Sequence, residues 1–564
     1  MSSVSQSSNW RALAADKKHR QEAAIPKEWR IPPVPDTQLD VTSVPEKCGL
    51  LTEKELEITN TDVTTLLARL SSAQWSSVEV TLAFYKRAIV AQQVVNCLTE
   101  IFVERALARA RELDEHLKTT GRVVGLLHGL PVSCKDMIRI KGLETTMGYA
   151  SWVGKYNEDN SVIVDILYEL GANPFVQTNV PQTLMWGETN NLIFGRTLNP
   201  HNRSLTSGGS SGGEGALLAM RGSPLGIGSD IAGSIRIPSA FNGLYGVRPS
   251  YGRIPFSGAL SILEGSDTSP AVFGPIAHDV ASVKIFMQAV LSTKPWLRDP
   301  LVVKKEWDER AYKLEEHGGN GGKLCFAICW DNGMVVPHPP VRRALEMTRD
   351  ALVTAGHRVI DWVPHRHAEM YEILNAIWAV GAEEQKIVTS TSGEPILTSM
   401  DPNEPVPEDF NVHKAATTPT PASALWQKQK AKRDIREEYL ARWENTAKAT
   451  GTGRPVDAII SPVAPYAAPP HGSNRDISYT AMWSALDYPS FAFPVTRVDP
   501  ALDVQTPRDK FLSALDEEIF NLYDPSKFVN ASVGLQLSGR TLEEEAVIAM
   551  TELVDAALKS FRDQ

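Results

Sequence analysis

The residues that could do chemistry in this chain gather in a glycine-rich stretch, residues 208–238, which reads GGSSGGEGALLAMRGSPLGIGSDIAGSIRIP. Pairs of glycines bracket Ser210 and Ser211, and Ser234 follows small residues. Glycine lets a main chain approach a ligand closely and take positive φ. The N–H groups of such a loop can converge on one point, as an oxyanion hole requires. The stretch therefore predicts a serine-based active site built largely from backbone.

A serine hydroxyl is a poor nucleophile near neutral pH and needs a base within hydrogen-bond reach. No histidine lies between His201 and His278, so the nearby basic candidate is Lys135, at the end of the run GLLHGLPVSCKD. That run is typical of a buried strand. Desolvation at the end of such a strand lowers the pKa of a lysine, which acts as a base only when neutral. A Ser-Lys pairing is a recognised variant of the catalytic triad.

The same stretch also matches three other kinds of segment in part. A flexible linker is also rich in Gly and Ser, but here the apolar run ALLAM and an Asp-x-x-x-Ser-x-Arg-x-Pro pattern follow. A phosphate-binding loop would need GxxxxGK[ST], and no lysine follows these glycines. Residues 209–213 satisfy the formula GxSxG of an α/β-hydrolase nucleophile elbow, for which Asp457 and His471 are formally available as partners.

The motifs GGSSGGEGA and GSDIAGSIRIPS, with PVSCKD upstream, resemble the amidase signature family of serine hydrolases. The order and spacing of Lys135, Ser210 and Ser234 fit the family's lysine, bridging serine and nucleophile. The resemblance continues through TNVPQTLMWGETNN, FNGLYGVRPSYGRIP and VGLQLSGRTLEEE and covers nearly the whole length. Within the family, the chain is most similar to fungal acetamidase-type general amidases.

The resemblance implies that Ser234 attacks the amide carbonyl, while Ser210 passes its proton to neutral Lys135 and later protonates the leaving amine. It also implies a cis peptide at Ser210. The expected donors of the oxyanion hole are the backbone N–H groups of Ile231, Ala232, Gly233 and Ser234. The positions expected to support the loop are Ser211, Asp230 and Arg236. The positions expected to line the substrate pocket are Leu184, Met185 and Trp186.

Ala232 departs from the family pattern, which most often has a second glycine directly before the one that precedes the nucleophile. Alanine disfavours positive φ. We therefore expect Ala232 to be a tolerated variation that at most shifts the oxyanion hole slightly.

The same resemblance implies an α/β fold in which a large mixed β-sheet core is covered by helices on both faces. We expect residues 1–120 to form an N-terminal helical region packed on the core, and residues 121–564 to form the amidase signature core as one structural unit. The segment 391–421, rich in Pro, Thr, Asp and Glu, predicts a long irregular insertion. A strongly charged helix is expected after it, from Ser423 to Thr446.

Composition narrows the class of protein. The chain has 564 residues, 42% of them hydrophobic and 22% charged, with a formal net charge of −10. This is ordinary globular composition, and the negative charge argues against a nucleic-acid partner. Five cysteines, an odd number, fit a reducing compartment. No stretch approaches eighteen apolar residues and the N-terminus has no apolar signal core, so we expect a cytoplasmic protein without a membrane span.

The sequence thus predicts a cofactor-free, metal-free amidohydrolase that converts a small or medium carboxamide to a carboxylic acid and ammonia, or an amine, through an acyl-enzyme. A homodimer is an expectation from the family. Three alternatives stay open: an amidotransferase-type subunit delivering ammonia to a partner chain, a specialised natural-product or fatty-acid amide hydrolase, and a binding module that has lost catalysis.

Overall fold

The computed structural model describes residues 10–319, 321–405 and 420–562 of the chain. Its strands are β1 (Leu98–Ile101), β2 (Pro131–Lys135), β3 (Asn173–Thr178), β4 (Leu198–Asn199), β5 (Asn202–Thr206), β6 (Leu225–Asp230), β7 (Tyr245–Arg248), β8 (Val272–Ala277), β9 (Cys325–Ile328), β10 (Arg358–Asp361), β11 (Ala458–Pro462), β12 (Ser490–Arg497) and β13 (Ser532–Ser538). Eleven of them form one sheet in the order β1-β3-β2-β6-β8-β7-β12-β13-β11-β9-β10, and β4 pairs with β5.

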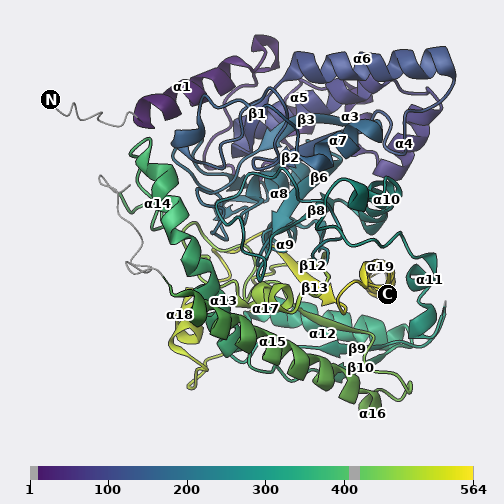
Figure 1. Cartoon of the computed structure of the whole chain (residues 1–564), viewed down its shortest axis with the longest axis vertical. Coiled ribbons are helices and arrows are strands. Elements are labelled where there is room, and N and C mark those ends of the chain that lie inside the picture. The colour runs from purple at the N-terminus through teal and green to yellow at the C-terminus, as the bar shows by residue number, and fades with distance from the viewer. Residues whose placement is uncertain (1–9, 320, 406–419, 563–564) are drawn as a thin grey trace.

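The α-helices surround this sheet along its width (Figure 1). Their bounds are α1 (Trp10–Ala23), α2 (Val44–Lys47), α3 (Glu53–Asn60), α4 (Val63–Ser71), α5 (Ser77–Val95), α6 (Val103–Thr120), α7 (Val162–Glu169), α8 (Gly212–Ala219), α9 (Arg236–Asn242), α10 (Val280–Ser292), α11 (Glu309–Tyr312), α12 (Pro339–Thr354), α13 (His367–Trp378), α14 (Ala382–Ser390), α15 (Ala422–Asn445), α16 (Ala447–Thr450), α17 (Ser478–Leu486), α18 (Ala514–Leu522) and α19 (Glu544–Arg562). The predicted α/β class with a large mixed sheet is confirmed.

The sheet contains both parallel and antiparallel strand pairs, and its parallel part determines where the candidate active site lies. Strand β2 is parallel to β3 and to β6, whereas β6, β8, β7, β12 and β13 are antiparallel neighbours. All residues of β2, β3 and β6 are buried, as expected for parallel strands covered on both faces. The carboxyl ends of these three strands meet at one edge, which is where ligands bind in open α/β sheets.

The N-terminal region is helical, but it also contributes to the sheet. Thr52 and Glu55 form a capping box at the start of α3. Strand β1 lies between α5 and α6 and pairs antiparallel with β3 as an edge of the main sheet. Within the described part of the N-terminal region, residues 10–120, one strand of the main sheet is thus present besides the helices.

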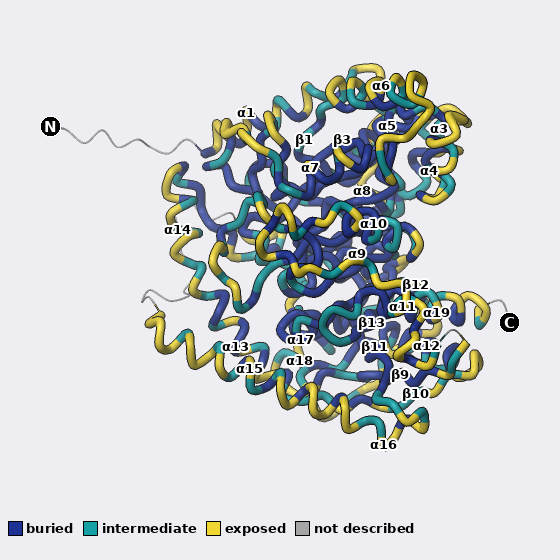
Figure 2. The backbone as a smooth tube through the Cα atoms, turned by 45° about the vertical axis from the view of Figure 1, so that its right-hand side comes forward, coloured by how far each residue is buried: buried dark blue, intermediate teal, exposed yellow. Residues whose placement is uncertain are grey.

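The expected insertion at 391–421 is described only in part. Residues 391–405 contain neither helix nor strand, and residues 406–419 lie outside the described ranges. The start of the segment is held by the buried carboxylate of Glu394, which accepts hydrogen bonds from Ala150 N and Ser151 N, both at 3.0 Å. The charged helix expected after it is α15, whose exposed outer surface is visible in Figure 2.

Burial follows the same layout: the strands in the middle of the sheet are buried, the edge strand β10 is partly exposed, and many exposed residues lie on the outer helices (Figure 2). Of the helices in the described ranges, none is long and apolar enough to cross a membrane. The five cysteines are free thiols, and four of them are buried.

Candidate active site

Lys135 is the last residue of β2 and is fully buried, with 0% of its surface exposed. Its Nζ lies 2.7 Å from Ser210 Oγ and 2.8 Å from Ser229 Oγ. Burial lowers the pKa of Lys135 from 10.5 to about 7, although the nearby carboxyl groups of Asp230 and Glu214 raise it in part. A substantial fraction of this amine is therefore neutral near pH 7, as a general base must be.

Ser210 lies in the turn that leads into α8, and the peptide bond between Gly209 and Ser210 is cis, as the resemblance implies. The glycines that follow allow this turn to press against the end of β3. A Cβ on Gly213 would lie 2.3 Å from the backbone nitrogen of Asn179, so a larger residue would push the turn away. The glycine content of the motif thus sets the position of the Ser210 hydroxyl relative to Lys135.

Ser234 lies in the turn between β6 and α9, and 8% of its surface is exposed. The backbone N–H of Ser211 donates to the Ser234 carbonyl at 3.2 Å, which ties the two serine turns together. Ser210, Ser229 and Ser234 all line one cavity. The structure thus gathers the three residues expected to be catalytic at the carboxyl end of β2 and β6.

The backbone before Ser234 accounts for the unusual alanine. Gly233 has a φ of +133°, which favours glycine, whereas Ala232 has no positive φ and fits without strain. The Gly233 N–H donates to Asp230 Oδ1 at 2.6 Å, so this expected oxyanion donor already has an acceptor. Within the described part of the chain, the N–H groups of Ile231, Ala232 and Ser234 have no hydrogen-bond partner.

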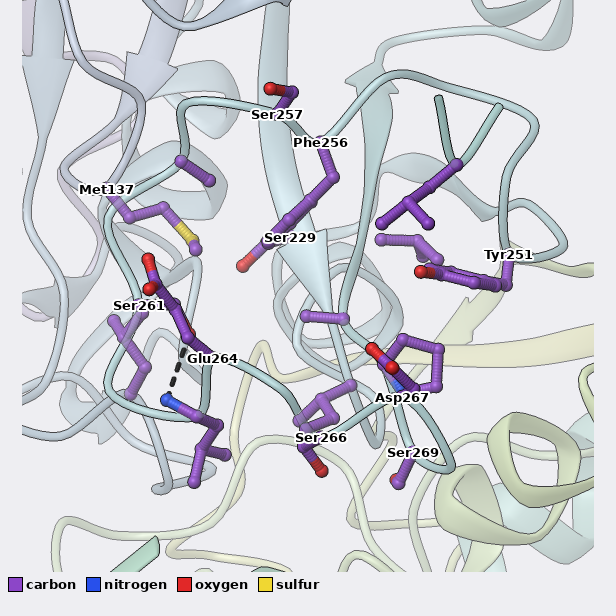
Figure 3. A pocket seen from close by; sticks show the side chains of 18 of the residues that line it. Met137, Ser229, Tyr251, Phe256, Ser257, Ser261, Glu264, Ser266, Asp267 and Ser269 are labelled. Carbon is purple, nitrogen blue, oxygen red and sulfur yellow. Dashed lines mark hydrogen bonds between the residues drawn. The ribbon is translucent and has the colours of Figure 1, made fainter. Parts of the chain in front are cut away.

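Two cavities meet at Ser234. The first, of about 310 Å³, is lined by Ser210, by Ser229 and by residues of the loop that runs from Tyr251 to β8, several of which are labelled in Figure 3. The second, of about 360 Å³, lies toward α13 and α14. Leu184 and Met185, two of the expected pocket residues, line both cavities, and the third, Trp186, lines only the second.

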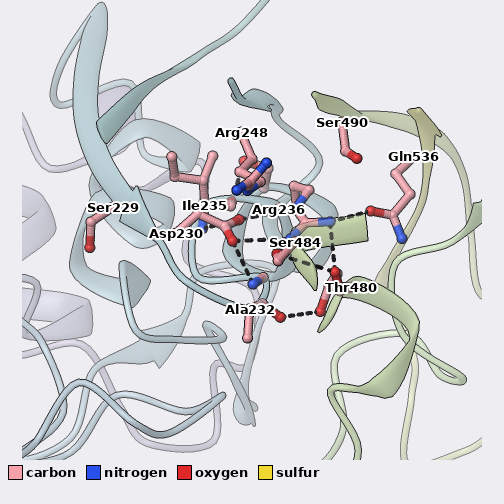
Figure 4. Close-up of polar contacts among 12 residues, drawn as sticks. Ser229, Asp230, Ala232, Ile235, Arg236, Arg248, Thr480, Ser484, Ser490 and Gln536 are labelled. Atoms are coloured by element: carbon pink, nitrogen blue, oxygen red, sulfur yellow. Dashed lines mark hydrogen bonds and ion pairs between the residues drawn. The ribbon is translucent and has the colours of Figure 1, made fainter. Parts of the chain in front are cut away.

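A buried ion pair, Asp230 and Arg236, lies next to the turn that carries Ser234 (Figure 4). Arg236 donates to both carboxylate oxygens of Asp230 at 3.0 Å, and its remaining N–H groups reach Gln536, Ser484 and the carbonyl of Thr480. Although burial alone would raise it, the pKa of Asp230 is held below its ordinary value by Arg236. The ionised carboxylate accepts from the N–H groups of Gly233 and Ile235 and so fixes the turn that carries Ser234.

Two polar residues of the site were not singled out from the sequence. Ser229 is the second hydroxyl on Lys135 Nζ, and it could have been inferred from the parallel pairing of β2 with β6, which brings their carboxyl ends together. Glu214 is a buried carboxyl that accepts from Ser133 Oγ at 2.6 Å and Thr178 Oγ1 at 2.8 Å. Burial raises the pKa of Glu214 to about 7.

Ser211, Asp457 and His471, the triad that a nucleophile elbow would require, do not bond one another in the structure. Ser211 Oγ donates to the carbonyl of Ser229 at 3.3 Å. Asp457 pairs instead with His317 Nδ1 at 2.9 Å, and His471 Nε2 bonds the carbonyl of Arg203 at 3.0 Å. Among the described residues, no group of three or more His, Cys, Asp or Glu could hold a metal ion.

Comparison with known proteins gives consistent results. The Amidase family model matches residues 79–548. The acetamidase of Aspergillus oryzae is 42% identical over 557 residues, covering 98% of this chain and 99% of that protein, and the acetamidase of Emericella nidulans is 41% identical with 98% of both covered. A solved fatty acid amide hydrolase is 33% identical with a TM-score of 0.88, covering 97% of this chain and 95% of that chain. These similarities confirm the resemblance drawn from the serine motifs.

Proposed function

Because the chain belongs to the amidase family and is an amide-hydrolysing enzyme, we propose that it cleaves small or medium carboxamides by a Ser-Ser-Lys mechanism. The products are a carboxylic acid and ammonia or an amine. The observation that carries this proposal is the fully buried Lys135 amine, held 2.7 Å from Ser210 Oγ beside a cavity that Ser234 also lines.

In the first half of the proposed reaction, Ser234 Oγ attacks the amide carbonyl carbon. Its proton passes to Ser210, whose own proton passes to neutral Lys135. The negative charge that develops on the carbonyl oxygen is stabilised by the N–H groups of Ile231, Ala232 and Ser234, each worth about 3 kcal/mol in the transition state. The Gly233 N–H keeps its hydrogen bond to Asp230, so it positions the loop and does not donate to the carbonyl oxygen of the substrate.

In the second half, the C–N bond breaks as Ser210 donates its proton to the leaving nitrogen and recovers one from protonated Lys135. This leaves the acyl group on Ser234 and Lys135 neutral again. Water then attacks the acyl-enzyme, and the same Lys135 and Ser210 relay takes up and returns its proton. The buried Asp230 and Arg236 pair is proposed to hold the turn through both halves, and Ser211 to hold it to the Ser210 turn.

The nearly full-length similarity to acetamidases supports small acyl groups and a chain that acts by itself, rather than an amidotransferase-type subunit. A specialised fatty-acid or natural-product amide remains the alternative substrate. A cytoplasmic location and a homodimer stay predictions.

Ammonia release from acetamide, hexanamide and benzamide tests the proposal, with wild type compared with Ser234→Ala. We expect release by the wild type and a loss on the order of 10⁴-fold in the variant, with an unchanged melting temperature. Activity that survives in Ser234→Ala would contradict the assignment of the nucleophile, and no release by the wild type from any of the three amides would contradict the substrate class.

A further inference from the structure

The peptide group that joins Ala232 to Gly233 is held at both of its ends. Its N–H, on Gly233, donates to Asp230 Oδ1 at 2.6 Å. Its carbonyl, on Ala232, accepts a hydrogen bond from the hydroxyl of Thr480 (Figure 4). Thr480 is fully buried and lies on α17, 248 residues further along the chain. The orientation of this one peptide group is therefore set from within the loop by Asp230 and from outside it by Thr480.

Thr480 also packs directly against the loop. A Cβ on Gly233 would lie 2.3 Å from Thr480 Oγ1, so the hydroxyl occupies the space that a side chain at residue 233 would need. The hydroxyl has one proton and two carbonyl oxygens within reach. The contact with the Ala232 oxygen is the shorter one, and the oxygen of Ile477 lies at 3.0 Å. In addition, the Thr480 carbonyl accepts from Arg236 at 3.1 Å, so both the side chain and the main chain of Thr480 are tied to the nucleophile turn.

The held peptide group lies between two of the proposed oxyanion donors. The N–H of Ala232 belongs to the peptide group directly before it, and the N–H of Ser234 belongs to the one directly after it. Neither N–H has a hydrogen-bond partner among the described residues. Gly233, at a φ of +133°, places few steric limits on rotation of the chain at this point. The hydrogen bonds at the two ends of the peptide group supply the restraint that the glycine lacks.

Thr480 itself is separate from the space open to the substrate. It lines neither of the two cavities that meet at Ser234, although Ile477, at the start of the same helix, lines the second. Any effect of the Thr480 hydroxyl on the reaction therefore passes through the loop. Donors that are already aimed at the developing charge need no reorganisation when the reaction takes place.

We propose that Thr480 is a positioning residue of this enzyme, whose hydroxyl holds the Ala232 and Ser234 N–H groups in the direction of the oxyanion. This inference rests on the proposed function. The carbonyl oxygen carries more negative charge in the tetrahedral intermediate than in the bound amide, so these donors act mainly in the transition state. Loss of the Thr480 hydroxyl should therefore lower kcat and leave KM nearly unchanged.

The test compares Thr480→Ala with Thr480→Ser, because both variants lose the methyl group and they differ only in the hydroxyl. The substrate is whichever of acetamide, hexanamide and benzamide the wild type cleaves fastest. Thr480→Ala should lower kcat at least about tenfold and change KM by less than about threefold, whereas Thr480→Ser should keep kcat within about threefold of the wild type. Thr480→Val keeps the volume of threonine and should show the same loss as Thr480→Ala, with the packing preserved.

Thr348→Ala is the matched control. Thr348 is fully buried on α12, and its hydroxyl also donates to a main-chain carbonyl, that of Ala344, at 2.8 Å. This variant loses the same atoms away from the site and should keep the kcat of the wild type. All rates are measured below the lowest melting temperature of the set, so that each variant is folded.

A boronic acid gives a second readout that a purely structural role would not change. Methyl-, pentyl- and phenylboronic acid carry boron in place of the carbonyl carbon of the three amides. Each accepts Ser234 Oγ at boron and forms a tetrahedral anion that resembles the intermediate. The Ki of the matching boronic acid should rise in Thr480→Ala by about the same factor as kcat/KM falls, and it should stay near the wild-type value in Thr480→Ser.

The proposal and the proposed function fail in different ways. If Ser234→Ala is inactive but Thr480→Ala matches Thr480→Ser in kcat, loses activity only through KM, or keeps the wild-type Ki, the amidase mechanism stands and the role of Thr480 is wrong. If Ser234→Ala retains activity, both are wrong.

Discussion

Of the three lysines that are buried within the described ranges, Lys135 and Lys17 are the least exposed, and they have opposite electrostatic properties. Lys135 is 0% exposed and Lys17, on α1, is 2% exposed. Burial lowers the pKa of Lys135 to about 7. Burial also acts against the charge of Lys17, but the carboxylates of Glu100 and Glu144, which both bond its Nζ, raise its pKa above the ordinary value.

The difference between the two sites lies in the partners of the amine. The Nζ of Lys135 meets two hydroxyls, which can bond a neutral amine as well as an ammonium. The Nζ of Lys17 meets two carboxylates, and Arg20 reaches Glu144 as well, at 2.8 Å. Burial alone therefore does not make a base. At the end of β2, hydroxyl partners satisfy the hydrogen bonding of Lys135 without supplying a charge, and this is the environment that the proposed base requires.

The largest expected effect that separates the two lysines is on activity. Lys135→Ala should lower kcat/KM on the order of 10⁴-fold, because it removes the base, while the melting temperature stays near that of the wild type. Lys17→Ala, measured at a temperature where it is folded, should change kcat/KM by less than about threefold. Comparable activity losses in both variants would remove the distinction.

The next effect is on stability and is expected at Lys17 alone. Lys17→Met leaves the Glu100 carboxyl without its cation and Glu144 with Arg20 alone, which should lower the free energy of unfolding by about 3–5 kcal/mol. Urea unfolding at pH 7 measures this change. Lys118→Met, which removes an exposed lysine 3.8 Å from Glu115, is the control and should not move the midpoint. An unchanged midpoint for Lys17→Met would mean that the cluster does not anchor α1.

Sequence reasoning reached one of these lysines and missed the other for a physical reason. Lys135 ends an apolar run, so its burial and its place at the edge of the sheet follow from local pattern and strand direction. Lys17 lies in the charged stretch WRALAADKKHRQEA, which looks solvated. Its partners Glu100 and Glu144 are 83 and 127 residues away, and such pairing leaves no mark on local periodicity.

Contacts between residues far apart in the sequence also explain what was missed elsewhere in the fold and the site. The four-residue strand β1 was not predicted within the N-terminal helices, because its pairing with β3 is a tertiary contact. The oxyanion loop was predicted with four equivalent donors, and the Gly233 N–H is instead bonded to Asp230. Glycine positions predict where the backbone can turn, but which N–H remains free depends on side chains that fold beneath it.

The pH dependence of activity sharpens the assignment of Lys135. Its pKa is lowered to about 7, so below that pH the amine is protonated and cannot accept a proton. The kcat/KM of the wild type should rise about tenfold per unit below pH 7 and level off above it. Lys17→Ala should keep the same profile, because Lys17 does not contact the reacting groups. A profile that stays flat between pH 5 and 9 would contradict the role of Lys135 as a base.

The smallest expected effect concerns the second hydroxyl on Lys135. Ser229→Ala removes a hydrogen-bond partner from a buried amine, a loss of about 1–3 kcal/mol, and should lower kcat/KM roughly tenfold. Ser229→Thr keeps the hydroxyl and should restore most of the activity, which a role limited to filling space would not predict.

Ser229→Asp tests the contrast between the two lysines directly, because it gives Lys135 a carboxylate partner like those of Lys17. A carboxylate at this position should raise the pKa of Lys135 and move the rise in kcat/KM to higher pH. If that rise stays near pH 7 in Ser229→Asp, the partners of the amine do not determine its charge, and the contrast between the two buried lysines needs another cause.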